Sequence, residues 1–263
     1  MTANERLQQH VRPSERFFLQ KATDWVSQAD REYRPVLTDF LNRRERYLVQ
    51  TIVNQTPSLQ FATNGGFADA EMQRGLVFPD YFVPQLSDFE LQLMAIDYPM
   101  RFATIKHYQI LGALLGTGVK REVLGDVITN QKHWQFYCEA TLVKYLQSNL
   151  TKIGSTTVSV LPVSMSSQLL PEDDSVLVHQ TLQSLRIDNV IAAAFHISRQ
   201  AANDLVRHGQ VRLNWFTEER PAEWLTVQDL VSVRGQGRFV LQTEDGFSKK
   251  GKIKATLAVI KHK

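Results

Sequence analysis

The alternation of hydrophobic and polar residues is most regular in the last third of the chain, between Leu185 and Phe239. Apolar residues recur there at helical spacing, and Ser198 divides the pattern into two short helices that it can cap. Gly209 is expected to end the second helix in the left-handed conformation, and Asn214 is expected to permit a turn. A small β-structure should follow, with strand positions at Val211, Leu213, Leu230, Val231 and Val233.

The second of these helices carries a row of polar residues on its outward face. Arg199, Asn203 and Arg207 are spaced four residues apart, so they share one side of an α-helix. A helix N-terminus offers free N–H groups and the positive end of a dipole, and arginine offers a planar fork that matches phosphate. The row is a candidate phosphate-binding surface, although its periodicity alone fits a solvated helix face better, since surface arginine is ordinary.

Residues 85–178 show a β-α-β-β-α-β order. Strands are expected near residues 91–96, 127–129, 134–138 and 157–163, and helices near residues 107–115 and 140–150. This is the order of the split βαβ, or ferredoxin-like, unit, which RNA-recognition domains share with many unrelated proteins. The aromatic motif that allows such a sheet to stack bases is absent. We therefore interpret Tyr137 as an ordinary half-exposed aromatic residue.

The first 84 residues have a less regular pattern. Helices are expected near residues 14–29, 38–53 and 67–75, with a short strand at residues 59–62 and a turn at Asn64-Gly65-Gly66. The predicted class is therefore α+β. It comprises a helical or mixed N-terminal region (1–84), a ferredoxin-like middle domain (85–178) and a small α+β C-terminal domain (179–263).

Charge is distributed unevenly along the 263 residues, whose net charge is +3. From Thr181 onward there are 13 Lys and Arg against 8 Asp and Glu, whereas the rest has 17 against 19. The C-terminal third should therefore attract nucleic acid. With one cysteine, Cys138, no intramolecular disulfide can form. The polar N-terminus and the lack of a long apolar run predict neither a signal peptide nor a membrane span, so a cytoplasmic location is expected.

Candidate catalytic residues are few. The glycines between Gly112 and Gly118 do not match a P-loop, and the seven histidines form no cluster with metal-ligand spacing. Cys138 lies among strand residues and is expected to serve packing. The string Leu185-Arg186-Ile187-Asp188 lies within the first C-terminal helix and does not form the catalytic motif of a pseudouridine synthase. We predict no catalytic residue, no cofactor and no metal.

The C-terminal segment resembles the S4 RNA-binding domain, named after the small-subunit ribosomal protein. The resemblance rests on Arg186-Ile187-Asp188, Ser198-Arg199, Gly209-Gln210-Val211, Asn214 and Arg234-Gly235-Gln236-Gly237-Arg238. Gln228-Asp229 stands where the family usually has Gly-Asp, a departure that bears on the turn and not on the binding face. The resemblance implies a helix pair packed on a small sheet. Together with the basic tail, it implies RNA contacts at Arg186, Ser198, Arg199, Asn203, Arg207, Arg212, Arg234, Arg238, Lys249, Lys250 and Lys252.

Nearly the whole chain resembles the YlmH family of bacterial RNA-binding proteins. The matching segments are residues 64–68 with Glu71, Lys106-His107, residues 111–128 and residues 245–252, where Ser248 replaces a common threonine. The residues themselves lead us to expect a non-enzymatic protein, monomeric and without membrane contact, and the resemblance implies its role. It would bind ribosomal RNA or tRNA at the large ribosomal subunit in bacterial ribosome-associated quality control. Two alternatives stay open: an RNA-modifying enzyme with its site in residues 85–178, and a cell-division-associated scaffold that binds a protein through the N-terminal helices.

Overall fold

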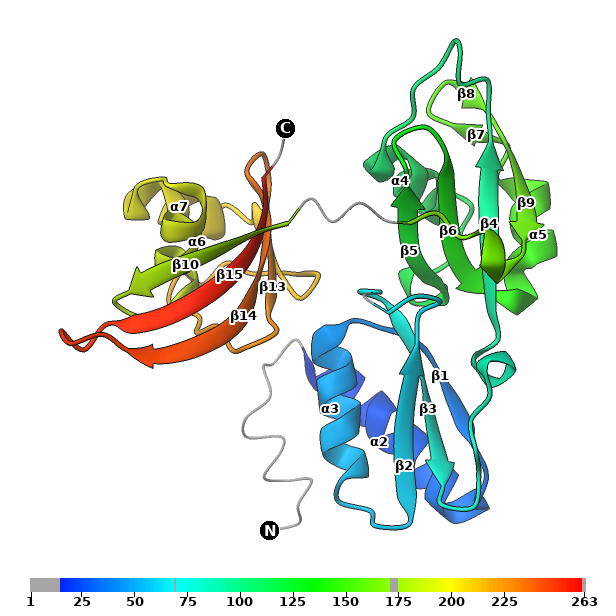
Figure 1. Cartoon of the computed structure of the whole chain (residues 1–263), viewed down its shortest axis with the longest axis horizontal. Coiled ribbons are helices and arrows are strands. Elements are labelled where there is room, and N and C mark those ends of the chain that lie inside the picture. The colour runs from blue at the N-terminus through cyan, green and yellow to red at the C-terminus, as the bar shows by residue number, and fades with distance from the viewer. Residues whose placement is uncertain (1–14, 69, 171–174, 262–263) are drawn as a thin grey trace. The chain divides into compact units, whose positions relative to one another are not determined.

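The structure is a computed structural model that describes residues 15–68, 70–170 and 175–261. The chain forms two compact units, residues 1–172 and 173–263, and every paired strand in the described ranges is antiparallel (Figure 1). The first unit contains an N-terminal part and a middle part, each with its own sheet. Within the described residues, no helix is long and apolar enough to cross a membrane.

The N-terminal part packs two helices on one face of a three-stranded sheet. Its elements are α2 (Arg16–Glu32), β1 (Val36–Leu41), α3 (Arg43–Val53), β2 (Leu59–Asn64) and β3 (Gln73–Pro79). The strand order is β1-β3-β2. Both helices and the sheet contribute to one core, which includes Leu19, Val26, Val49, Ile52 and Val77. The predicted strand at residues 59–62 is confirmed, whereas the predicted helix start at Ser14 lies outside the described residues.

Two predicted helices of this part are wrong at least in part. Residues 38–41 belong to β1, so the helix expected from residue 38 begins only at Arg43. Asn42 caps it: the Asn42 side chain accepts from the Glu45 N–H at 3.0 Å, and the Glu45 carboxylate accepts from the Asn42 N–H at 2.8 Å. None of the described residues in the helix expected at residues 67–75 is helical: residues 67, 68 and 70–72 form turns, bends or irregular chain, and residues 73–75 lie in β3. In both places pairing between β1 and β3 prevails over the local pattern.

The middle part has the expected β-α-β-β-α-β order. Its main elements are β4 (Leu91–Asp97), α4 (His107–Gly116), β5 (Leu124–Thr129), β6 (Trp134–Glu139), α5 (Val143–Asn149) and β9 (Ser159–Val163). Short 3-10 turns lie at Leu86–Phe89, Arg121–Val123, Ala140–Leu142 and Met165–Ser167, and the small hairpin β7 (Lys152–Ile153) and β8 (Thr156–Thr157) precedes β9. The sheet order is β5-β6-β4-β9.

Both faces of this sheet are covered. One face packs against α4 and α5 through Met94, Phe136, Ile110 and Leu146. Tyr137 lies in the core on the other face and is 0% exposed, so its interpretation as a half-exposed aromatic is wrong. Residues of the N-terminal part supply the cover, an arrangement that the strand's own sequence does not reveal.

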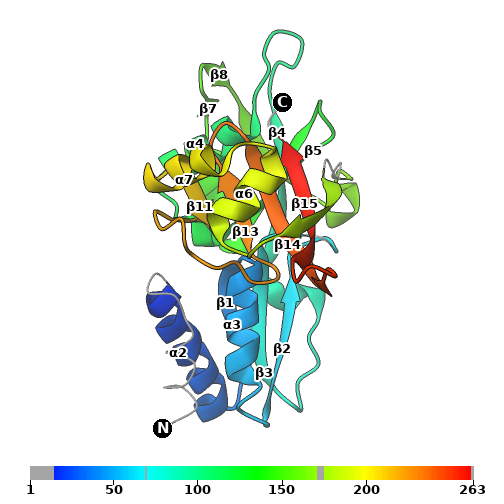
Figure 2. The ribbon, with the colours of Figure 1, turned by 90° about the vertical axis from the view of Figure 1, so that its left-hand side faces the viewer.

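The C-terminal unit packs two short helices on one face of a six-stranded sheet (Figure 2). The helices are α6 (Ile187–Phe195) and α7 (Arg199–Arg207). The sheet order is β10-β15-β14-β13-β11-β12. The strands are β10 (Val176–Leu182), β11 (Val211–Leu213), β12 (Phe216–Thr217), β13 (Leu230–Val233), β14 (Gly237–Phe247) and β15 (Ile253–Lys261). The predicted helix pair is confirmed, and Gly209 adopts the expected positive φ of 65°.

Candidate nucleic-acid interface

The junction between α6 and α7 is fixed by local hydrogen bonding. α6 ends at His196, whose φ of 56° reverses the chain. Ser198 then caps α7, because its hydroxyl accepts a hydrogen bond from the Ala201 N–H at 3.1 Å. The capped start of α7 is exposed to solvent, as is the side chain of Arg199.

A buried carboxylate joins the starts of the two helices. The Asp188 side chain is 1% exposed and accepts from Arg186 Nε at 3.1 Å and Nη2 at 3.0 Å. It also accepts from Arg199 Nε at 3.2 Å, although Arg199 lies eleven residues later in the chain. Burial alone would raise the pKa of Asp188, but the hydrogen bonds and charges of the two arginines outweigh burial and lower it.

The result is a pair of arginines held by one carboxylate but facing water. The Arg199 side chain is 53% exposed and the Arg186 side chain 32% exposed. Each guanidinium has five N–H donors, and Asp188 engages only one or two of them. The remaining donors have a fixed orientation and can bind an anion with little loss of side-chain entropy.

Asn203 and Arg207 continue from Arg199 along α7. They lie at the expected spacing of four residues, with Arg207 exposed and Asn203 half-buried. The buried side of the same helix is made by Ala202 and Val206. The structure therefore brings together five of the predicted contacts, which form the arginine face of the helix pair: Arg186, Ser198, Arg199, Asn203 and Arg207.

Arg212 and Arg238 lie on the sheet and not on the helix layer. Arg212 is paired with Ser232, which is paired with Arg238. Their strand neighbours, such as Val211 and Phe239, point into the core beneath the helices. Because side chains alternate along a strand, Arg212 and Arg238 project from the opposite face of the sheet. The structure does not join these two arginines to the arginine face.

Arg234 and the lysines occupy two different ends of the β14–β15 hairpin. Arg234 is exposed just before β14, and its N–H donates to the Gln210 carbonyl at 2.9 Å, close to the end of α7. Lys249, Lys250 and Lys252 lie in the turn after β14. The eleven residues of β14 separate the two places by about 30 Å. A single track that runs from Arg234 directly into the lysine turn is not present.

Two buried polar side chains stabilise the turn next to this sheet. Asn214 Nδ2 donates to Asp229 Oδ1 at 2.7 Å, and Asn214 Oδ1 accepts from the Leu230 N–H at 3.0 Å. Asp229 Oδ2 also accepts from the Thr226 N–H at 2.7 Å. Gln228 stands before Asp229 with a φ of 74°, a conformation that favours glycine. Although Gln228 stands where the family usually has glycine, the turn keeps the backbone conformation that glycine favours.

The role of Asp188 is the main feature that sequence reasoning missed. Its position in the first turn of α6 suggests only a favourable interaction with the helix dipole. The available signal was its place two residues after Arg186, since such spacing lets both side chains meet at a helix start. Its contact with Arg199 depends on how α6 packs against α7, which no local pattern contains.

Cys138 and two glycines of the Gly112–Gly118 segment lie within regular secondary structure of the middle part. Burial raises the pKa of the Cys138 thiol to about 12, so it stays protonated near neutral pH. In the described ranges, no group of three or more His, Cys, Asp or Glu side chains is placed to hold a metal ion. Gly112 and Gly116 lie inside α4 and form no nucleotide-binding loop.

The C-terminal unit has the architecture of an S4 RNA-binding module, and comparison with known families agrees. Three family models match: "YlmH, N-terminal" over residues 14–82, "Putative RNA-binding domain in YlmH" over residues 84–167, and "S4 domain" over residues 185–231. The chain belongs to the YlmH family.

Two relatives support this assignment. The chain is 35% identical over 248 residues to "Ribosome-associated protein quality control protein P2" of Bacillus subtilis (strain 168), covering 94% of this chain and 96% of the relative. It also resembles a solved structure, "Cell division protein ylmH from Streptococcus pneumoniae", at 31% identity and a TM-score of 0.53. That similarity covers 61% of this chain and 97% of the solved chain. No enzyme family is indicated by these matches.

Proposed function

We propose that this protein binds ribosomal RNA or tRNA at the large ribosomal subunit and acts in bacterial ribosome-associated quality control. The B. subtilis relative, which is similar over almost the whole chain, carries that process in its name. The S4 domain and the arginine face supply a physical basis for RNA binding. On this proposal the protein works in the cytoplasm as a monomer, needs no cofactor and catalyses no reaction.

The observation that carries this proposal is the arginine pair held by Asp188. A solvated helix face would leave its arginines free to move, whereas here a buried carboxylate orients Arg186 and Arg199 together. Arg207 lies two turns further along the same helix. A row of oriented guanidinium groups at a capped helix start fits the phosphates of an RNA backbone.

The other predicted contacts take supporting roles in this proposal. Arg234 extends the arginine face at the end of α7, and Arg212 and Arg238 would touch RNA only if it wraps to the other face of the sheet. Lys249, Lys250 and Lys252 form a separate basic turn. Because Leu182 pairs with Ile253, that turn lies at the end of the sheet from which the chain enters α6.

We also infer three domains, with boundaries at residues 1–84, 85–178 and 179–263. The middle domain would be ferredoxin-like and similar to RNA-recognition domains, since its strand order, β5-β6-β4-β9, is that of the split βαβ unit. The N-terminal domain is mixed, with two helices on three strands. These domains would position the S4 module on its RNA target.

Sedimentation with purified ribosomal subunits tests the proposal. The wild-type chain should co-sediment with the large subunit at low salt and dissociate as salt rises, because phosphate contacts release counterions. The double variant Arg199→Glu/Arg207→Glu should fail to co-sediment at any salt, since it places two negative charges on the arginine face. Arg16→Glu/Arg31→Glu changes the charge equally on α2 and should behave as wild type.

Three results would contradict the proposal. The first is unaltered co-sedimentation of Arg199→Glu/Arg207→Glu, and the second is an equal loss in the Arg16→Glu/Arg31→Glu control. The third is a chemically altered nucleotide after incubation of the protein with RNA, which would indicate an RNA-modifying enzyme.

A further inference from the structure

The sheet face that RNA-recognition domains commonly use for stacking bases is closed in the middle part. Tyr137 and Leu93 on this face pack against Phe40, Met72 and Phe67 of the N-terminal part. The rings of Phe67 and Tyr137 have their centroids 6.0 Å apart. Gly66 lies so close that a Cβ atom there would come within 2.2 Å of the Tyr137 ring. Nucleotides cannot stack on Tyr137 without displacing this segment.

The chain after β9 closes another section of the same face. Gln135 Nε2 donates to the Ser167 carbonyl at 2.9 Å, and Gln135 Oε1 accepts from the Leu169 N–H at 2.8 Å. Gln135 is 6% exposed. If the middle part contacts RNA, it must use a surface other than the face of its sheet.

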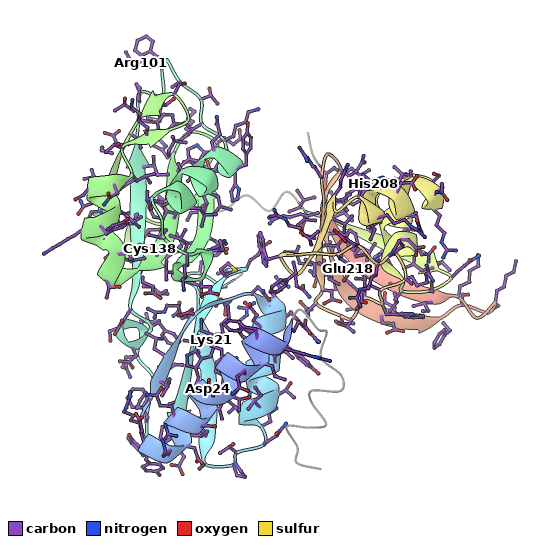
Figure 3. All side chains as sticks on the ribbon, turned by 180° about the vertical axis from the view of Figure 1, so that it is seen from behind. Lys21, Asp24, Arg101, Cys138, His208 and Glu218 are labelled. Carbon is purple, nitrogen blue, oxygen red and sulfur yellow. The ribbon has the colours of Figure 1, made fainter. Side chains whose placement is uncertain are left out.

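One end of the middle part presents such a surface. The segment after β4, residues 98–106, meets the turn between β5 and β6, where the Tyr98 hydroxyl donates to the Lys132 carbonyl at 3.0 Å. Figure 3 shows Arg101 at this end, projecting away from the sheet. We call this the tip surface and define it as Met100, Arg101, Phe102, Lys106, Tyr108 and Lys132.

The tip surface exposes large apolar side chains. Phe102 is 90% exposed, Tyr108 is 67% exposed and Met100 is 48% exposed. The loop is nevertheless anchored, because Ile105 is only 3% exposed and the Tyr98 hydroxyl binds the Lys132 carbonyl. Single exposed apolar residues are common on proteins, but here three large ones lie within nine positions, in an anchored loop and the helix start that follows it.

The charged side chains of the tip surface itself are all positive. Arg101, Lys106 and Lys132 are all exposed, and the acidic residue in the adjoining strand end is Asp97. Aromatic rings that alternate with cations are the arrangement by which proteins bind unpaired nucleotides: a ring stacks on a base and the cations track the backbone. A protein partner with an apolar surface would need no such excess of positive charge.

We propose that the tip surface binds unpaired RNA nucleotides, with Phe102 stacked on a base and Arg101, Lys106 and Lys132 on the flanking phosphates. This inference deepens the proposed function, because it adds a second RNA contact to the same chain. Two linked contacts bind more tightly than either alone, so the tip surface would raise the affinity and narrow the choice of RNA site.

The test measures binding of the full chain to a short unstructured RNA of adenosine and uridine by fluorescence anisotropy. Phe102→Ala should raise Kd by about 5- to 100-fold, the range for loss of one stacked base. Phe102→Trp retains a stacking face and should bind as wild type. Phe17→Ala is the matched control, because Phe17 is 82% exposed on α2 and should not affect Kd.

A photocrosslinking experiment locates the contact directly. RNA that contains 4-thiouridine should crosslink to the peptide with residues 98–106 in the wild-type chain, and Phe102→Ala should remove this crosslink. An unchanged Kd for Phe102→Ala, or the same change for Phe17→Ala, would overturn the inference. So would weaker association of Phe102→Ala with large subunits at unchanged affinity for protein-free RNA, since that result indicates a protein partner.

The two proposals fail in different ways. If Arg199→Glu/Arg207→Glu loses RNA binding while Phe102→Ala retains it, the tip surface is excluded and the proposed function stands. If Phe102→Ala loses binding while Arg199→Glu/Arg207→Glu retains it, the tip surface is supported and the role of the arginine face is excluded.

Discussion

Each unit contains an arginine that pairs with a carboxylate, but Arg74 in the first unit is itself buried, whereas the arginines around Asp188 in the C-terminal unit reach solvent. In the first unit the Arg74 side chain is only 7% exposed, and it donates to the carbonyls of Thr38, Phe89 and Glu90 and pairs with Glu139. In the C-terminal unit the carboxylate of Asp188 is buried, whereas Arg199 is exposed and Arg186 is half-buried.

The difference separates a charge that serves the fold from charges that we propose bind RNA. The donors of Arg74 go to groups of its own unit, so this arginine joins β1, β3 and the chain before β4. A buried Asp188 instead directs its cations outward, where they can meet an anionic partner.

Removing the buried cation should damage the first unit alone. Arg74→Met leaves the carbonyls of Thr38 and Phe89 without their donor and Glu139 without its partner. We expect the free energy of unfolding of the first unit to fall by about 3–5 kcal/mol. Calorimetry should show a lower transition temperature for this unit, with RNA binding by the C-terminal unit retained.

Arg16→Met on the exposed start of α2 is the control and should leave the transition unchanged. If Arg74→Met unfolds at the wild-type temperature, Arg74 has no structural role and the comparison between the units fails.

Buried acids should make the first unit more stable at mildly acidic pH. Burial, together with the negative charge of Glu71, raises the pKa of Asp126 to about 6. Hydrogen bonds from the N–H groups of Glu71 and Met72 act in the opposite direction but do not cancel this rise. Burial likewise raises the pKa of Glu45 to about 7. Both acids bind protons more readily in the folded state, so their protonation stabilises the fold. This stabilisation is fully present below the pKa values that the two acids have in the unfolded chain. It is lost as pH rises through about 6 and about 7.

We expect the unfolding free energy of the first unit to fall by about 1–3 kcal/mol between about pH 5 and pH 7.5. Asp126→Asn and Glu45→Gln should each reduce this dependence, since neither amide titrates and each still accepts a backbone hydrogen bond. A stability that rises over the same pH range in the wild-type chain would show that these acids are not destabilised by burial.

Neutralising Asp188 should weaken RNA binding even though it makes the chain more positive. Asp188→Asn removes the charge that orients Arg186 and Arg199. Net charge alone would lower the Kd for RNA. Loss of the fixed arginine orientation should instead raise Kd by about 5- to 30-fold, or about 1–2 kcal/mol. Anisotropy with the same RNA decides between the two signs. Tighter binding by Asp188→Asn would mean that these arginines act only through their charge.

A turn variant should separate stability from binding in the C-terminal unit. Gln228 has a φ of 74°, which costs a non-glycine residue more than glycine. Gln228→Gly should therefore raise the free energy of unfolding by up to about 1 kcal/mol, with an unchanged Kd for RNA. Thermal unfolding measures the first effect. A loss of RNA affinity in Gln228→Gly would place this turn within the binding surface.

Features set by neighbouring residues could be predicted from the sequence. The Ser198 cap, the left-handed Gly209 and the spacing of Arg199, Asn203 and Arg207 depend on a few adjacent positions, and the structure has all of them. The local periodicity of apolar residues also predicts the β-α-β-β-α-β order of the middle part.

Features set by distant residues could not be predicted in this way. Residues 38–41 have an apolar pattern that also fits a helix, and only pairing with β3 makes them a strand. Tyr137 is buried by Phe40, Phe67 and Met72, which lie far upstream in the chain. The length of β14 keeps the lysine turn away from Arg234, although the two are close in sequence.

The salt dependence of RNA affinity, compared between the wild-type chain and Arg199→Ala/Arg207→Ala, shows directly whether the arginine face binds phosphate. Each phosphate contact contributes about 0.7–0.9 to the slope of log K against log salt concentration. If both arginines bind phosphate, the double variant should have a slope smaller by about 1.4–1.8. An identical slope would contradict the account, because it would show that the arginine face touches no phosphate.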